Sequence, residues 1–142
     1  MEITVRNSQK IKTINPQKVK RYILKLAGEL SVVIEDISLL FCEDSFLQEL
    51  NYQYFKKNVP TDVIAFPFEE FSEKRIVSGE ILISVQRAYE QAAQYGNDVD
   101  REVYLYVTHG FLHLMGHSDK PAPAAEKMRR LQEDLLNRLY AP

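Results

Sequence analysis

All three histidines of the chain lie between positions 109 and 117, in the segment THGFLHLMGHSDK. His109 and His113 are four residues apart on a predicted helix, so both imidazoles project from one face of it. Metalloproteases of the HExxH type bind zinc through two histidines at this spacing. We therefore predict that His109 and His113 hold one divalent metal ion. The structural alternative is a pair of core histidines with satisfied hydrogen bonds.

A third protein ligand has to come from beyond the helix, because each further step of four residues rotates away from the first histidine. Gly116 ends the predicted helix and lets the chain turn back. Either His117 or Asp119 could then complete the site. His117 directly follows the bend and continues the helical offset, which points it past the ion. Asp119 has room to return, and we favour it as the third ligand.

Two histidines, one carboxylate and a water form a known catalytic zinc set, whereas structural zinc sites are usually rich in cysteine. Cys42 is the only cysteine of the chain and lies in an apolar run, which indicates a buried thiol. Zinc lowers the pKa of a bound water to about 7 and so supplies hydroxide at neutral pH. The residues thus predict a zinc-dependent hydrolase with His109, His113 and Asp119 as metal ligands and catalytic residues. Nickel, iron or cobalt would also suit this ligand set.

One absence in the motif bears on the substrate. HExxH proteases place a glutamate general base directly after the first histidine, and this chain has Gly110 there. A peptidase would need a more distant base such as Glu80. Peptide hydrolysis is therefore the less favoured reading of the metal site.

Length and composition predict one soluble domain over residues 1–142. The net charge of −2 argues against a protein that is basic all over, although lysines and arginines gather in the N-terminal part of the chain. A single cysteine and no recognisable signal peptide favour the cytoplasm. No apolar stretch approaches the roughly 20 residues that cross a bilayer, so we expect no membrane contact.

Apolar periodicity places strands and helices in a mixed order along the chain. Asn15 followed by Pro16 predicts a helix start, because a capping side chain precedes proline at the first helical position. We expect strands at 1–6, 36–42, 62–68 and 79–85, a charged loop at 69–78, and helices at 16–28, 44–55, 86–95, 100–115 and 124–139. Within 44–55, Phe46, Leu47, Leu50 and Tyr54 are expected to face inward. The predicted fold class is α+β: a small mixed four-stranded sheet flanked by helices, with the metal site on a central helix.

Several motifs give the sequence a specific resemblance to a known family. His109 to Gly116 matches the pattern HGxLHLxG without a gap, residues 60–67 (PTDVIAFP) match PTDVxxFP, and residues 79–81 match a GDI-type strand. In the same order and spacing, these motifs are found in the YbeY family of bacterial metal-dependent endoribonucleases. The chain resembles that family over roughly residues 47–119.

The resemblance implies a substrate and partners. The expected activity is cleavage of single-stranded RNA in ribosomal RNA processing, maturation and quality control during ribosome biogenesis. Ribosomal RNA precursors are the expected substrate, and ribosomal proteins are further expected partners. The resemblance implies a substrate cleft beside the metal that includes Thr61 and Asp62, with Lys57 as a phosphate contact.

The chain departs from the family pattern at two positions. The family usually closes its site with a third histidine, where this chain has Asp119, and aspartate is a competent zinc ligand. The family commonly carries an arginine where this chain has Phe55, which cannot hold a phosphate. Lys56 or Lys57 could supply a charge there, but lysine lacks the bidentate fork of arginine.

The leading hypothesis is therefore a metal-dependent endoribonuclease that hydrolyses RNA with a metal-activated water. One alternative is a ribosome-assembly or RNA-binding factor whose metal site is mainly structural. The other is a metallohydrolase of another substrate, including peptides.

Overall fold

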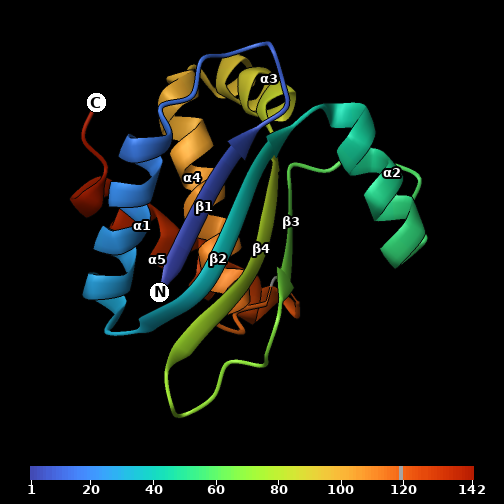
Figure 1. Ribbon diagram of the computed structural model, residues 1–142. Coiled ribbons are helices and arrows are strands. Elements are labelled where there is room, and N and C mark those ends of the chain that lie inside the picture. Colours follow the sequence, from blue (N-terminus) through green and yellow to red (C-terminus); the bar gives the residue numbers. More distant parts are fainter. Residues whose placement is uncertain (119) are drawn as a thin grey trace.

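A four-stranded mixed sheet forms the centre of the molecule in a computed structural model that describes residues 1–118 and 120–142. The strand order is β1-β2-β4-β3 (Figure 1), with β1 (Glu2–Asn7), β2 (Val33–Cys42) and β4 (Ile76–Ser84) parallel to one another. The edge strand β3 (Val63–Pro67) pairs antiparallel with β4 and ends at Pro67, where a missing N–H is tolerated. The predicted mixed four-stranded α+β fold is confirmed.

Two strands begin earlier than predicted. Ile76 pairs with Val33 and Val77 with Ile34, so the ladder between β4 and β2 reaches into the expected charged loop. A register irregularity between Ile34 and Asp36 lets the polar pair Glu35-Asp36 remain within β2. Alternation along a single strand does not reveal such cross-strand pairing.

Five helices complete the described part of the chain: α1 (Pro16–Leu30), α2 (Asp44–Phe55), α3 (Val85–Tyr95), α4 (Val99–Leu114) and α5 (Ala122–Leu139). The helix start predicted at Asn15 is confirmed, because its side chain accepts hydrogen bonds from the amides of Gln17 and Lys18. Asp98 caps α4 in the same way, through the amide of Asp100.

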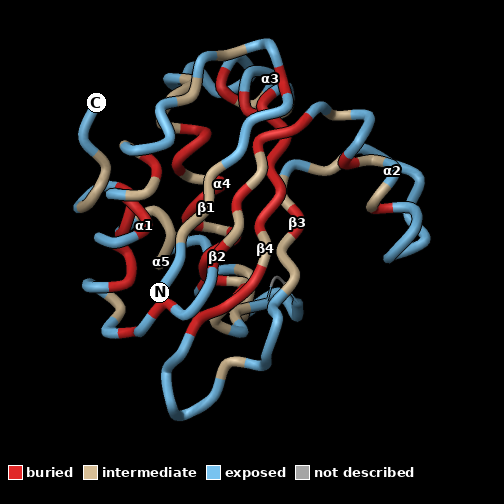
Figure 2. The backbone as a smooth tube through the Cα atoms, viewed as in Figure 1, coloured by how far each residue is buried: buried red, intermediate tan, exposed pale blue. Residues whose placement is uncertain are grey.

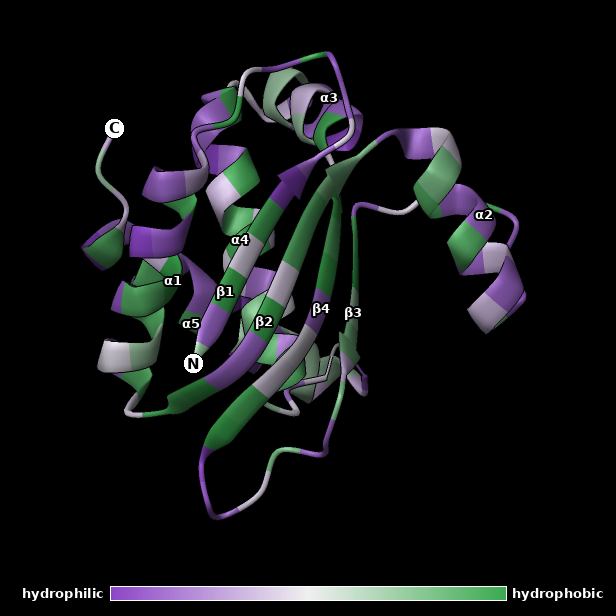
Figure 3. Ribbon diagram, in the orientation of Figure 1, coloured by the Kyte–Doolittle hydropathy of each residue, from purple (hydrophilic) through white to green (hydrophobic). Residues whose placement is uncertain are grey.

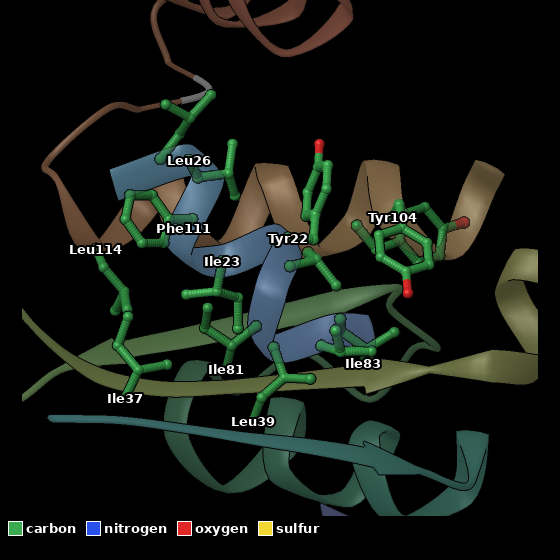
Figure 4. Close-up of a cluster of buried hydrophobic side chains, with 14 of the residues drawn as sticks. Tyr22, Ile23, Leu26, Ile37, Leu39, Ile81, Ile83, Tyr104, Phe111 and Leu114 are labelled. Carbon is green, nitrogen blue, oxygen red and sulfur yellow. The ribbon is translucent and has the colours of Figure 1, made fainter. Parts of the chain in front are cut away.

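The main core lies between one face of the sheet and helices α1 and α4. Alternate residues of β2 and β4, among them Ile37, Leu39, Ile81 and Ile83, meet apolar side chains of both helices there (Figure 4). Buried residues run along β2 and β4 in Figure 2, and the same strands are predominantly hydrophobic in Figure 3. Because α4 belongs to this core, its backbone is held on the sheet.

The other face of the sheet carries a much smaller apolar cluster beneath α2. It comprises the buried residues Cys42, Leu47, Ile64 and Leu82. Helix α2 stands out to one side of the sheet (Figure 1), and its only buried residues are Leu47 and Asn51. The prediction that Phe46 and Tyr54 face inward is wrong, since their side chains are 47% and 63% exposed.

No helix in the described part of the chain combines the length and apolar character needed to span a membrane.

Candidate metal centre

Helix α4 holds the two predicted histidine ligands in the middle of the fold. Asp100 and Glu102 lie in its first turn, where carboxylates interact favourably with the helix dipole. A Cβ atom at Gly110 would stand 2.6 Å from Cγ2 of Ile81 and 3.3 Å from Cγ1 of Val63. Glycine therefore lets α4 approach β4 and β3 closely at the residue next to His109.

His109 and His113 bring their Nε2 atoms to 3.0 Å from each other. The two rings are 4.6 Å apart between centroids and inclined at 71°. Two nitrogens bound tetrahedrally to one zinc ion at about 2.0–2.1 Å would be separated by about 3.3 Å. The two Nε2 atoms are within hydrogen-bond distance of each other, and a separation wider by a few tenths of an ångström would suit two ligands of one zinc ion.

Gln132 of α5 fixes the orientation of the first histidine. Its Oε1 lies 2.8 Å from Nδ1 of His109. An amide oxygen only accepts, so Nδ1 carries the proton and Nε2 keeps its lone pair. Metal-binding histidines commonly have such a partner on the second nitrogen. Sequence analysis did not find Gln132, because its only local pattern is that of an amphipathic helix.

The third ligand stays a prediction, because Asp119 lies outside the described residues. After α4, Gly116 adopts a positive φ of 88°, which produces the predicted bend. His117 is half-buried, and burial followed by the charge of Lys127 lowers its pKa. Within residues 1–118 and 120–142, no three His, Cys, Asp or Glu side chains converge on a possible metal position, so His117 does not complete a set with the histidine pair.

The residues predicted to contact substrate lie in the connection from α2 to β3. The buried Asn51 side chain donates to the carbonyl of Val59 and so anchors this segment. The Asp62 carboxylate accepts from the amide of Val63, and the Asp62 carbonyl accepts from the amide of Ser84. Asp62 thus fixes the start of β3, a positioning role that the sequence did not indicate.

Thr61 is half-buried and Lys57 is exposed. The connection that carries them leads into Val63, the residue that packs beside Gly110 of α4. The structure therefore places Thr61 two residues and Asp62 one residue before Val63, which packs against α4. It shows no contact of Lys57 with the histidine pair among the described residues.

Two further polar groups lie on α4 before the histidines, and sequence analysis missed both. Burial raises the pKa of the Glu102 carboxyl, and the nearby carboxylate of Glu133 raises it further. The Tyr106 hydroxyl is buried and has no hydrogen-bond partner in the described part of the chain. Both residues lie within the helix expected at 100–115, and the sequence pattern assigned neither of them a role.

Comparisons with known proteins agree on one family. The family model described as Endoribonuclease YbeY matches residues 2–140. An Endoribonuclease YbeY from Treponema denticola is 36% identical over 129 residues, which cover 87% of this chain and 83% of that protein. Another from Thermoanaerobacter sp. is 31% identical over 155 residues, with 98% of each chain covered.

A solved structure shows the same fold. The solution structure of TM1509 from Thermotoga maritima aligns with a TM-score of 0.58 at 25% sequence identity. The alignment covers 96% of this chain and 90% of that one.

Proposed function

The chain belongs to the YbeY endoribonuclease family, and from this premise we propose that it hydrolyses single-stranded RNA at a divalent metal ion held by His109 and His113. Ribosomal RNA precursors are the proposed substrate, and the proposed role is in ribosomal RNA maturation. The proposed compartment is the cytoplasm, which suits a chain whose single cysteine is a buried free thiol.

The observation that carries this proposal is the convergence of the two Nε2 atoms at 3.0 Å, with Gln132 holding His109 in the tautomer that a ligand needs. Asp119 is the proposed third ligand and zinc the proposed ion. When bound, such an ion supplies Lewis-acid charge that acidifies water and offsets charge on phosphoryl oxygens.

The other residues of the site would position the substrate. Net hydrolysis adds the elements of water across a phosphodiester bond, leaving a phosphate on one fragment and a hydroxyl on the other. Gln132 prevents rotation of the His109 ring, and Gly110 keeps α4 close to β3. Lys57 would hold a substrate phosphate as a point charge beside the turn at Thr61-Asp62.

The direct test measures cleavage of a labelled single-stranded oligoribonucleotide by the purified protein, with and without chelator. We expect chelation or His113→Ala to reduce the rate more than about 100-fold, because removal of even a residue behind a ligand commonly costs 10–100-fold. Undiminished cleavage by chelated protein and by His113→Ala would refute the proposal.

Two further variants identify the third ligand. Asp119→Ala should lose metal and cleavage together, while His117→Ala serves as the matched control and should retain both. The reverse result would move the third ligand to His117.

The phenylalanine at position 55 favours a second candidate function, an RNA-binding or ribosome-assembly factor with a structural metal. In that case chelation lowers the melting temperature, RNA binding persists, and neither metal-loaded nor metal-free protein cleaves RNA.

A further inference from the structure

Three aromatic rings meet where the end of α2 comes beside β3. Phe55 stacks on Phe66 with ring centroids 6.1 Å apart and an interplanar angle of 4°. Tyr54 meets Phe66 edge-on, with centroids 5.2 Å apart. We call Tyr54, Phe55 and Phe66 the aromatic platform.

The platform is unusually open for a set of large rings. Phe55 is 49% exposed and Tyr54 is 63% exposed, and α2 lies away from the main core (Figures 1 and 2). Isolated apolar side chains on a surface are normal, but grouped and exposed rings mark a surface for binding. The parallel Phe55–Phe66 pair is already a stack, so a third flat ring placed on the open face of Phe55 would extend it.

The charge beside the platform identifies the kind of partner. Lys56 and Lys57 follow Phe55 directly, and both are exposed. Neither forms an ion pair with any residue that the structure describes. The nearest acid by strand register is Glu80, opposite Phe66, which lines a neighbouring hollow together with Arg6. Stacking rings beside uncompensated cations are the combination that binds single-stranded nucleic acid.

Strand β3 connects the platform to the histidine pair. One face of β3 packs on α4, because Val63 lies beside Gly110, next to His109. At its other end, Phe66 O and Pro67 Cα border Gly79 together with the side chain of Leu114, next to His113. The Phe66 ring projects from the opposite face, into the cluster beneath α2. RNA that crosses this edge strand would reach the platform on one side and the histidines on the other.

We propose that the aromatic platform binds one or two unpaired bases of single-stranded RNA by stacking, while Lys56 and Lys57 contact the adjoining phosphates. A base would then stack on Phe55. Its ring would position the substrate at the place where the family commonly carries an arginine. The inference rests on the proposed function for the identity of the substrate.

Binding to metal-free protein tests the inference separately from cleavage. The probe is a fluorescein-labelled oligoadenylate, and its anisotropy is followed at fixed salt in chelator. Loss of a stacking ring should raise the Kd roughly 5- to 100-fold, so we expect Phe55→Leu to fall in this range. Phe55→Trp keeps a flat ring and should bind at least as tightly as the unaltered protein.

The matched control is Phe46→Leu on the same helix. Phe46 is 47% exposed, nearly as much as Phe55, but makes no ring contact with the platform. Its Kd should stay within about twofold of the unaltered protein. Replacing Lys56 and Lys57 by glutamine should lower the salt dependence of binding without removing the effect of Phe55→Leu.

Three outcomes would overturn the inference. Equal Kd values for Phe55→Leu and Phe46→Leu, with RNA still bound and with cleavage by the metal-loaded proteins unchanged, would leave the proposed function standing and assign the platform to another partner. Weaker binding by Phe55→Trp than by Phe55→Leu would exclude stacking, even if the leucine variant folded poorly. Absence of RNA binding by the unaltered metal-free protein would overturn the inference, whereas the proposed function would fail only if the metal-loaded protein also left RNA uncleaved.

Discussion

Helices α4 and α2 both border β3, but the fold holds them in opposite ways. Helix α4 lies in the main core, with ten of its residues buried, whereas α2 buries only Leu47 and Asn51. The tightly packed helix carries the histidine pair, whose geometry has to be maintained within tenths of an ångström. The projecting helix carries Tyr54 and Phe55, two of the three rings of the aromatic platform, on which we propose that a flexible RNA strand binds. The difference places the candidate metal ligands on a firmly packed helix and the proposed stacking surface at the end of a loosely packed one.

The largest difference should appear in amide hydrogen exchange. Amides in α4 should open only with the whole domain, whereas α2 can detach from its small cluster by local unfolding. We expect amides in the middle of α2 to exchange at least about 100-fold faster than those of α4. Equal protection of the two helices would show that α2 is held as firmly as α4.

Cys42 provides an independent report on α2, because it is buried beneath that helix. Burial, followed by the charges of Asp44 and Glu43, raises the pKa of its thiol to about 12. Iodoacetamide at pH 8 should therefore modify Cys42 only when α2 opens. The modification rate should match the exchange rate of α2 amides and exceed that of α4 amides after correction for intrinsic reactivity.

A methyl group at Gly110 tests the close packing of α4. Gly110→Ala places a Cβ 2.6 Å from Ile81 and should lower the free energy of unfolding by about 1–3 kcal/mol. Gly28→Ala in α1 is the control, because its Cβ would meet no atom within 4 Å. That substitution should stabilise the protein by about 0.5–1 kcal/mol. A free energy of unfolding that Gly110→Ala leaves unchanged or raises in urea denaturation would show that α4 is not tightly constrained there.

Substitutions at Gln132 test whether a residue that contacts a predicted metal ligand, but does not itself bind metal, affects metal affinity. Gln132→Leu removes the acceptor of His109 Nδ1–H, so zinc affinity should fall by about 10- to 100-fold. Gln132→Glu retains an acceptor oxygen and should keep most of that affinity. Competition with a chromogenic chelator measures the zinc affinity of both variants. An unchanged affinity in the leucine variant would show that Gln132 does not contribute to metal binding.

The smallest effect should be a pH dependence from Glu102. Its folded-state pKa is raised by burial, then by Glu133, with Arg101 opposing and Asp62 adding to the rise. The stability that the protonated form contributes is fully present below the unfolded pKa and is lost as pH rises through the folded value. Relative to the unaltered protein, Glu102→Gln should therefore gain stability between pH 4 and pH 7.

Glu126 serves as a control, because its folded-state pKa is shifted in the opposite direction from that of Glu102. Arg129, and then Arg130, lower its pKa to about 2. Its contribution is present above the unfolded pKa and is lost as pH falls, so Glu126→Gln should lose stability at pH 7 relative to pH 3. The same sign for both variants in urea titrations would contradict the assignment for Glu102.

Local patterns in the sequence predicted the parts of the molecule that depend on local geometry. The cap at Asn15, the strands, the central helix and the facing of His109 and His113 all follow from spacing within a few residues. The partner of His109 did not follow, because Gln132 comes from another helix and its position depends on how α5 packs on α4. The prediction that Phe46 and Tyr54 face inward was wrong, because an apolar stripe is buried only where its helix packs along a neighbouring element. Helix α2 projects from the sheet and does not pack in this way.

The proposed activity depends on one metal ion held by His109 and His113. Elemental analysis of protein purified without added metal, compared with His109→Ala prepared in the same way, measures whether the two histidines hold that ion. We expect about one divalent ion per unaltered chain, and almost none in the variant, provided that the variant still shows a cooperative unfolding transition. Equal metal in both proteins, or none in the unaltered protein even after incubation with zinc, would contradict it.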